Sequence, residues 1–166
     1  KEARDMFDLQ PGSSILVLGD EKRGLAILPR EAQSQFISRI FADMENEDKD
    51  RIGVIIGSGI GGITTLTLEA MGYSEGGRVP RFNPFMIPKM IPDIAAGLVS
   101  IKYGLRGPNY ATVSACASSC HAMINAFDLI RLGKADVILT GGSEAGISIQ
   151  SVGGFNSAQA LSVRNE

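Results

Sequence analysis

The sequence is poor in the residues that build disulfide scaffolds and metal centres. It has one histidine and two cysteines, Cys116 and Cys120, which are spaced one helical turn apart. So few cysteines argue against a disulfide scaffold and favour a reducing cytoplasm. No apolar run approaches the roughly 20 residues needed to cross a bilayer, and the first residues lack the basic-then-apolar pattern of a secretion signal. We therefore expect a cytoplasmic protein with no membrane association.

A strong charge of either sign is also absent. The net charge of −2 argues against a chain dominated by polyanion binding. The charge is nevertheless uneven, because residues 1–50 carry a net −4 and residues 51–166 a net +2. The change coincides with the polar run at 45–50, which is typical of a surface linker. This predicts two segments, residues 1–46 and residues 47–166.

The first segment reads as a β-hairpin followed by a helix. Residues 14–18 and 24–28 are apolar runs of strand length, and charged residues lie between them at the expected tip. Pro29 should end the second strand. Residues 30–44 place apolar side chains on one helical face, which predicts an amphipathic helix.

Glycine is abundant, with 20 residues that lie mostly after residue 50. The fully apolar run at 52–56 predicts a strand covered on both faces. Gly57, Gly59 and Gly62 follow it and match the spacing of a dinucleotide-binding fingerprint.

A later acidic residue could belong to this fingerprint, but the sequence that follows does not fit a dinucleotide-binding unit. Glu75 lies at a suitable distance after the helix predicted over residues 63–71. However, the proline-rich residues 80–92 do not supply the next strand of a prompt βαβ unit. We therefore favour tight turns and close packing over nucleotide binding as the role of these glycines.

Another short stretch places a thiol between a strand and a helix. Residues 110–114 contain β-branched residues and predict a strand. Cys116 should therefore lie in the first turn of the following helix, where free backbone N–H groups and the helix dipole favour a thiolate, the nucleophilic form. The alternative is a small buried cysteine without reactivity. The helix is predicted from helical spacing with Gly133 as its stop, and its apolar positions are Met123, Ile124, Phe127, Leu129 and Ile130.

The remaining elements complete an alternating pattern. Residues 82–91 are apolar but contain prolines that prevent one long helix, and we weigh ordinary core against a functional surface there. Residues 94–103 predict a helix ended by Gly104. Residues 135–140 predict a buried strand that forms a parallel βαβ unit with residues 110–114. The sequence therefore predicts an α/β layered fold.

Three polar residues near this unit need separate interpretation. Cys120 lies one turn deeper than Cys116 and should pack. The two cysteines offer only two metal ligands and His121 faces another way, so we expect no metal site. His121 follows Cys116 too closely to be its base, and we interpret it as structural. Glu144 is either a structural hydrogen-bonding carboxylate, which we favour, or a site residue.

Several separated motifs over about residues 48–166 occur in a known order. In this order the sequence resembles bacterial elongating β-ketoacyl-acyl carrier protein synthases of the thiolase superfamily. The motifs are RIGVIIGSGIGG at 51–62, NPFMIP at 83–88, SACASSCHA at 114–122, GKADVILTGGSEA at 133–145, GGF at 153–155 and ALSVRN at 160–165. Such enzymes are more than twice as long as this chain, so the resemblance implies the amino-terminal half of a thiolase fold.

The resemblance implies a decarboxylative Claisen condensation in fatty-acid synthesis. Cys116 would accept the acyl group as a thioester, and its N–H would form half of an oxyanion hole. Ile60 matches a residue that gates the acyl pocket, and Phe85 one that lines it near a dimer partner. The implied partners are acyl carrier protein carrying acyl and malonyl groups and a second copy of the chain, with no cofactor.

The resemblance also implies that these residues do not complete the reaction. In such synthases two histidines, a lysine and the second oxyanion-hole N–H come from the carboxy-terminal half. The motifs of that half do not occur in this sequence. We therefore expect an acyltransferase lineage but no condensation by this chain alone.

Residues 1–45 resemble the latter part of an AbrB/SpoVT-type DNA-binding domain. Lys1 and Arg4 match basic positions of that family, but no further basic cluster follows, and DNA affinity needs a run of phosphate-neutralising side chains. A solvated helix start is the favoured alternative. Nucleic acid is therefore a partner only if the chain is a regulator fragment joined to a non-catalytic thiolase-fold segment.

Overall fold

A computed structural model describes residues 15–20, 24–29, 42 and 47–164. Its first elements form an antiparallel hairpin, with β1 (Ile15–Asp20) paired to β2 (Gly24–Pro29). This confirms the predicted hairpin, and β1 runs two residues further toward the tip than expected. Lys1, Arg4 and, apart from residue 42, the helix predicted over residues 30–44 lie outside the described residues.

Three parallel strands form the central sheet. β3 (Ile52–Gly57) lies in the middle, with β4 (Asn109–Thr112) on one side and β5 (Val137–Gly142) on the other. Both outer strands pair parallel to β3. The apolar run of β3 explains its central place, because a middle strand is covered on both faces. The predicted strand at 52–56 is confirmed, and the β4 and β5 segments lie within two residues of their predicted bounds.

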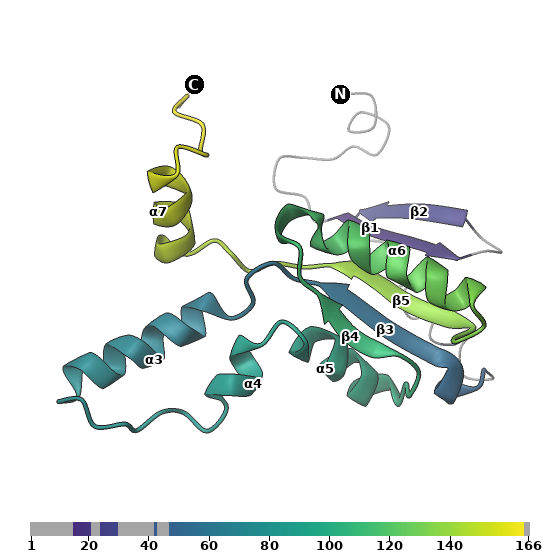
Figure 1. Ribbon diagram of the computed structural model, residues 1–166, viewed down its shortest axis with the longest axis horizontal. Coiled ribbons are helices and arrows are strands. Elements are labelled where there is room, and N and C mark those ends of the chain that lie inside the picture. The colour runs from purple at the N-terminus through teal and green to yellow at the C-terminus, as the bar shows by residue number, and fades with distance from the viewer. Residues whose placement is uncertain (1–14, 21–23, 30–41, 43–46, 165–166) are drawn as a thin grey trace.

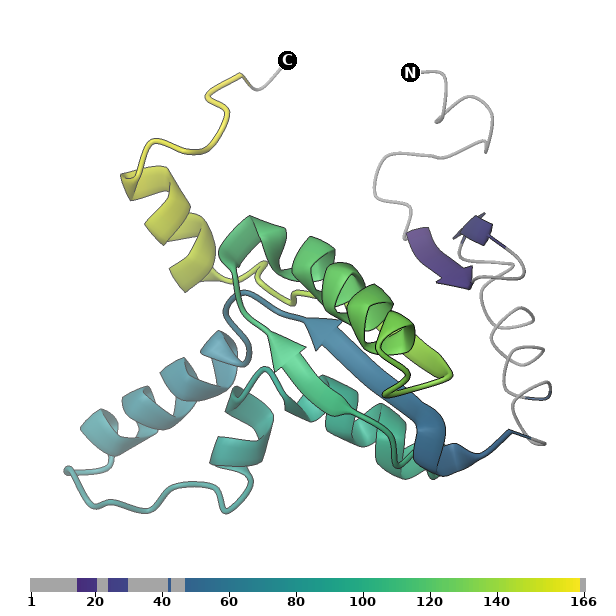
Figure 2. The same cartoon turned by 45° about the vertical axis from the view of Figure 1, so that its right-hand side comes forward.

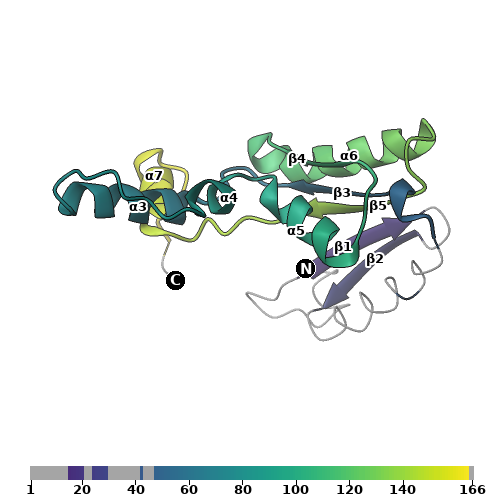
Figure 3. The same cartoon turned by 90° about the horizontal axis from the view of Figure 1, so that it is seen from below.

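Helices cover the two faces of this sheet (Figures 1 to 3). On one face α6 (Ser118–Arg131) packs through Ala122 and Ala126 against Ile55. On the other face α5 (Ile94–Tyr103) packs through Ala96 against Val54. These layers confirm the predicted α/β fold, and each fully buried Ile or Val contributes about 1.5–3 kcal/mol.

The helix stops behave as the sequence predicts. Gly104 is the left-handed C-cap of α5, with φ 69°. Gly133 lies just beyond the end of α6 with φ 67°. Both conformations suit a residue without a Cβ.

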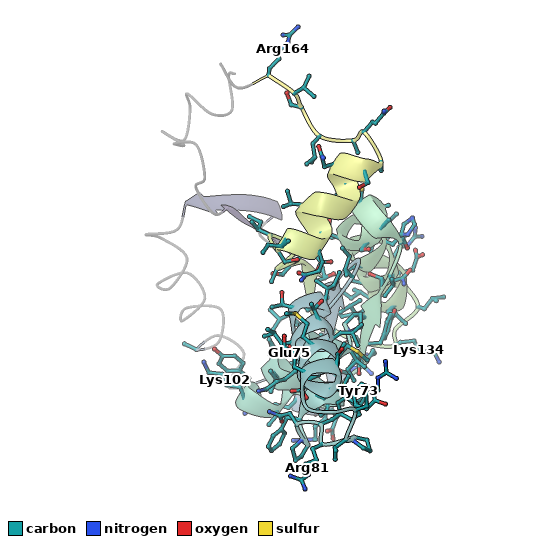
Figure 4. All side chains as sticks on the ribbon, turned by 90° about the vertical axis from the view of Figure 1, so that its left-hand side faces the viewer. Tyr73, Glu75, Arg81, Lys102, Lys134 and Arg164 are labelled. Carbon is teal, nitrogen blue, oxygen red and sulfur yellow. The ribbon has the colours of Figure 1, made fainter. Side chains whose placement is uncertain are left out.

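Two helices extend away from the sheet as an arm, residues 63–90 (Figure 1). It consists of α3 (Ile63–Glu75), a loop, and α4 (Met86–Met90). Figure 4 looks at its outer end, near Tyr73 and Glu75. Helix α3 has no buried residue, and α4 has none. The helix predicted over 63–71 is confirmed and continues to Glu75.

The apolar residues of the arm do not form core within this chain. Leu68 is 63%, Phe85 65% and Ile87 56% exposed. The ordinary-core interpretation of residues 82–91 is therefore wrong, because the large apolar side chains Phe82, Phe85, Ile87 and Ile91 are all exposed. After β5, α7 (Ile149–Ser157) lies near the base of α3. Among the described residues, no helix is both long and apolar enough to span a membrane.

Candidate active site

The three parallel strands end at one edge of the sheet, and Cys116 lies there. Gly57 at the end of β3 is level with Thr112 of β4 and Gly142 of β5. Sites in open parallel sheets form at the carboxyl ends of the strands. The chain leaves β4 at this edge and turns directly into α6, and Cys116 belongs to that turn.

Cys116 is exposed at the start of the helix, as predicted. It lies in a 3₁₀ turn (Ala115–Ala117) that leads without a break into α6. Ala115 adopts φ 49°, a left-handed conformation that costs energy in a residue with a Cβ. Such strain persists only where surrounding contacts impose it. The alternative of a buried Cys116 is wrong, and its role as a nucleophile stays a prediction.

Ser118 provides the contacts that impose this turn. Its side chain is 4% exposed, and its Oγ donates to Ala115 O at 2.7 Å and accepts from Ser114 N at 2.8 Å. Thr112 Oγ1 donates to Ser118 O at 2.7 Å and so connects β4 to the helix start. Sequence analysis missed Ser118, because one serine among several small residues gives no distinguishing signal.

Two glycines allow the helix start to approach the sheet. A Cβ on Gly57 would lie 2.5 Å from Ser118 O, and one on Gly142 would lie 2.5 Å from Ser119 Cβ. These positions admit no side chain without a shift of backbone. The close-packing interpretation of the Gly57 motif is therefore confirmed.

The other residues near Cys116 differ in outcome. His121 Nδ1 lies 2.7 Å from Ser114 Oγ, which supports the structural interpretation. The expectation that Cys120 packs is wrong, because Cys120 is exposed. Ser118, Ala122 and Ala126 form the buried face of α6. Cys120 lies midway in sequence between Ser118 and Ala122, which places it on the opposite side of the helix.

Glu144 connects the loops that follow β3 and β5. Its Oε2 accepts from the backbone N–H groups of Gly59 and Ile60, each at 2.7 Å. The favoured hydrogen-bonding role is thus confirmed. Gly59, the residue before Ile60, lies beside the Cys116 turn, because a Cβ on Gly59 would lie 3.4 Å from Ala115 O. Met90 at the end of α4 contacts this loop, because its carbonyl accepts from Gly62 N. Phe85 lies at the opposite end of α4, just before its first residue.

The part of the chain that the structure describes contains no cluster of metal-binding side chains. There, no three His, Cys, Asp or Glu side chains gather where they could hold an ion.

Comparison with known proteins decides the family. The model of the family described as "Beta-ketoacyl synthase, N-terminal domain" matches residues 31–166. The chain belongs to the β-ketoacyl synthase family. The match begins before the boundary predicted between residues 46 and 47.

Relatives in this synthase family come from plants and bacteria. The mitochondrial 3-oxoacyl-[acyl-carrier-protein] synthase of Arabidopsis thaliana is 45% identical over 120 residues, covering 72% of this chain and 26% of the relative. The 3-oxoacyl-[acyl-carrier-protein] synthase 2 of Staphylococcus aureus (strain N315) is 43% identical over 124 residues, covering 75% and 30%. This chain therefore spans less than a third of the length of the curated synthases it matches.

A solved β-ketoacyl synthase shares the fold. The crystal structure of a β-ketoacyl synthase from Burkholderia phymatum STM815 aligns with a TM-score of 0.66 and 29% identity, covering 82% of this chain and 33% of that one. The predicted thiolase-like α/β fold is thus confirmed. The AbrB/SpoVT resemblance is not supported by these matches and stays a prediction.

Proposed function

We propose that this chain supplies the acyl-accepting cysteine of a 3-oxoacyl-acyl carrier protein synthase. The observation that carries the proposal is the exposed Cys116 in a strained turn at the start of α6. This turn lies at the carboxyl ends of the parallel strands, where the sites of open parallel sheets form. The names of the relatives give the reaction class.

The reaction has two half-steps that share Cys116. In the first, the Cys116 thiolate attacks the thioester carbonyl of an acyl-carrier protein, and the carrier thiol leaves with a proton. In the second, a malonyl-carrier protein loses carbon dioxide, and the resulting carbanion attacks the acyl-cysteine carbonyl. The Cys116 sulfur then leaves, which yields the β-ketoacyl-carrier product and regenerates the thiolate. Covalent catalysis of this kind divides one difficult step into two easier ones.

The turn also supplies electrostatic help to the first half-step. In this proposal the Cys116 N–H, in the turn ahead of the helix, would donate to the oxyanion that forms at the acyl carbonyl. Fixed donors aimed at charge that develops only in the transition state are among the largest catalytic contributions.

Ile60 and Phe85 are the proposed acyl-pocket residues. The loop holding Ile60 lies next to the Cys116 turn. Phe85 is 65% exposed on the arm, so it can contact an alkyl chain or a second subunit. Apolar linings of this type bind flexible alkyl substrates.

The proposed partners are acyl carrier protein and a second copy of the chain. The printed names of the relatives include acyl carrier protein. The several exposed large apolar side chains of the arm support a homodimer, because exposed apolar surface can mark an interface. Sedimentation should then give about twice the 17.6 kDa of one chain, and Leu68→Glu should return it to a monomer. A wild-type monomer at high concentration would contradict the dimer.

Mass spectrometry after incubation with an acyl-carrier protein tests the first half-step. We expect the acyl mass on the peptide that contains Cys116. Cys116→Ala should abolish it, whereas the matched Cys120→Ala should retain it. Acylation that persists in Cys116→Ala, or none in the wild type, would contradict the proposal.

A further inference from the structure

Glu144 accepts hydrogen bonds from the middle of the loop that follows β3. The loop after β3 is anchored at its start, where Ser58 N donates to Thr112 O at 3.2 Å, and at its end, where Gly62 N donates to Met90 O at 2.9 Å. Between these anchors, the N–H groups of Gly59 and Ile60 both donate to Glu144 Oε2. Ser58 Oγ approaches the same oxygen at 3.3 Å.

A single carboxylate oxygen that accepts several donors is a strong and specific clamp. Hydrogen bonds to an ionised acceptor are about twice as strong as those between neutral groups. Glu144 is nevertheless exposed, so it is not buried to complete a core. Its carboxylate reaches across from the end of β5 to the loop after β3, and these strands are neighbours at the site edge.

The clamped loop is adjacent to the turn of the nucleophile. The position of a Cβ on Gly59 would be 3.4 Å from both Ala115 O and Glu144 Oε2, so Gly59 lies between the carboxylate and the Cys116 turn. Ile60, the next residue, is 42% exposed at this edge. Movement of the loop would therefore move Ile60 relative to Cys116, while the turn itself is held separately by Ser118.

We propose that Glu144 is a positioning residue for the acyl chain. By clamping the Gly59 and Ile60 amides it fixes the side chain of Ile60 beside Cys116, so that a long alkyl chain meets a preformed wall. This inference rests on the proposed function, in which Cys116 accepts an acyl group. A preformed wall avoids the cost of ordering the loop during binding, and that cost grows with the length of chain that must contact it.

The test compares electrophiles of different length on matched variants. Glu144→Ala removes the charge and the acceptor, whereas Glu144→Gln removes the charge but keeps an acceptor oxygen. The difference between them therefore reports the clamp rather than the electrostatic effect on the thiol. Glu75→Ala, at the outer end of α3, is the control for loss of an exposed carboxylate (Figure 4). Reaction of Cys116 is followed with iodoacetamide and with acetyl and decanoyl thioesters.

We expect Glu144→Ala to slow decanoyl transfer about tenfold relative to acetyl transfer, with iodoacetamide within about twofold of wild type. The ratio of the decanoyl rate to the acetyl rate should stay close to the wild-type ratio in Glu144→Gln and should equal it in Glu75→Ala. Equal slowing of all three reagents would show a general structural role and overturn the inference. Unchanged selectivity in Glu144→Ala would overturn it as well.

Amide hydrogen exchange gives a second readout that needs no acyl donor. The Ile60 amide should exchange faster in Glu144→Ala than in Glu144→Gln, while the Ala117 amide, which donates to Ser114 O, should not change. Unaltered exchange at Ile60 would contradict the clamp. A wild-type chain that shows the clamp but takes no acyl group would refute the proposed function and, with it, the acyl role of Glu144. If the wild type is acylated and Glu144→Ala keeps the wild-type ratio of decanoyl to acetyl rates, only the role of Glu144 is refuted.

Discussion

Gly57 and Ser118 lie backbone against backbone: a Cβ on Gly57 would be 2.5 Å from the Ser118 carbonyl carbon. This approach seats the start of α6 on the end of the central strand. The position of Cys116 therefore depends on a glycine that is distant in sequence and has no reactive group. A substitution there tests whether the site is set by the packing of the strand end against the helix.

Gly57→Ala should destabilise the protein and displace the thiol. The added methyl meets backbone, which cannot move aside as a flexible side chain can, so we expect a loss of about 1–3 kcal/mol in the free energy of unfolding. Urea unfolding measures this loss, and transfer of an acyl group to Cys116 should slow in parallel. The matched control is Gly97→Ala in α5, where a Cβ would meet nothing within 4 Å. That variant should be neutral or stabilised by up to about 1 kcal/mol. Equal stability of the two variants would contradict the packing account.

Ser118→Ala should loosen the Cys116 turn. The substitution removes the hydroxyl that Ser114 N–H and Ala115 C=O contact, while Ala115 C=O keeps the Ser118 N–H, and each lost hydrogen bond costs about 0.5–1.5 kcal/mol. Thermal or urea unfolding measures the cost. Ser157→Ala on α7, whose exposed hydroxyl donates to Gly153 O, should change stability by less than about 0.5 kcal/mol. If Ser118→Ala were as mild as this control, Ser118 would not hold the turn.

Asp136 should make stability depend on acid pH. Hydrogen bonds from Arg51, one of them 2.6 Å long, lower the pKa of Asp136 below its usual value near 3.8. A lowered pKa in the folded state means that the ionised form contributes stability above pH about 4, and this contribution is lost as the pH falls through the lowered value.

Urea midpoints at pH 6 and in steps down to pH 2.5 measure this dependence. Asp136→Asn should show a smaller fall in midpoint over the acid range than wild type, and Arg51→Gln should reduce the fall similarly, because each breaks the same pair. The pair is exposed on both sides, so the change should be small. An unchanged acid slope in both variants would show that the pair does not contribute.

Local sequence patterns predicted the scaffold well. The apolar run of β3, the helix at 94–103 and the glycine stops reflect local periodicity and backbone conformation, which a single sequence carries. The placement of Cys116 at a helix start followed from the same pattern, since a strand signal gives way there to a helical one.

Tertiary contacts explain what the sequence did not reveal. The apolar spacing of α6 suggested Met123, Ile124 and Phe127, yet these are exposed, and the alanines Ala122 and Ala126 face the sheet because small side chains let the helix approach β3. The exposure of Cys120 has the same origin. The clamp by Glu144 joins residues more than 80 positions apart, and no local pattern contains such a pairing.

The most direct test of the account is the relative alkylation of the two cysteines. Both thiols are exposed, Cys116 in the turn ahead of α6 and Cys120 in the first turn of α6, so each can react with a small reagent. The chain is treated with limiting iodoacetamide near pH 7, and fragment-ion mass spectrometry of the tryptic peptide 107–131, which holds both cysteines, locates and quantifies the label over time. We predict that Cys116 reacts about tenfold faster than Cys120, because Cys116 lies in the turn ahead of α6, at the edge where the strands end, whereas Cys120 lies within the helix. Equal rates, or faster reaction of Cys120, would contradict the assignment of Cys116 as the nucleophile.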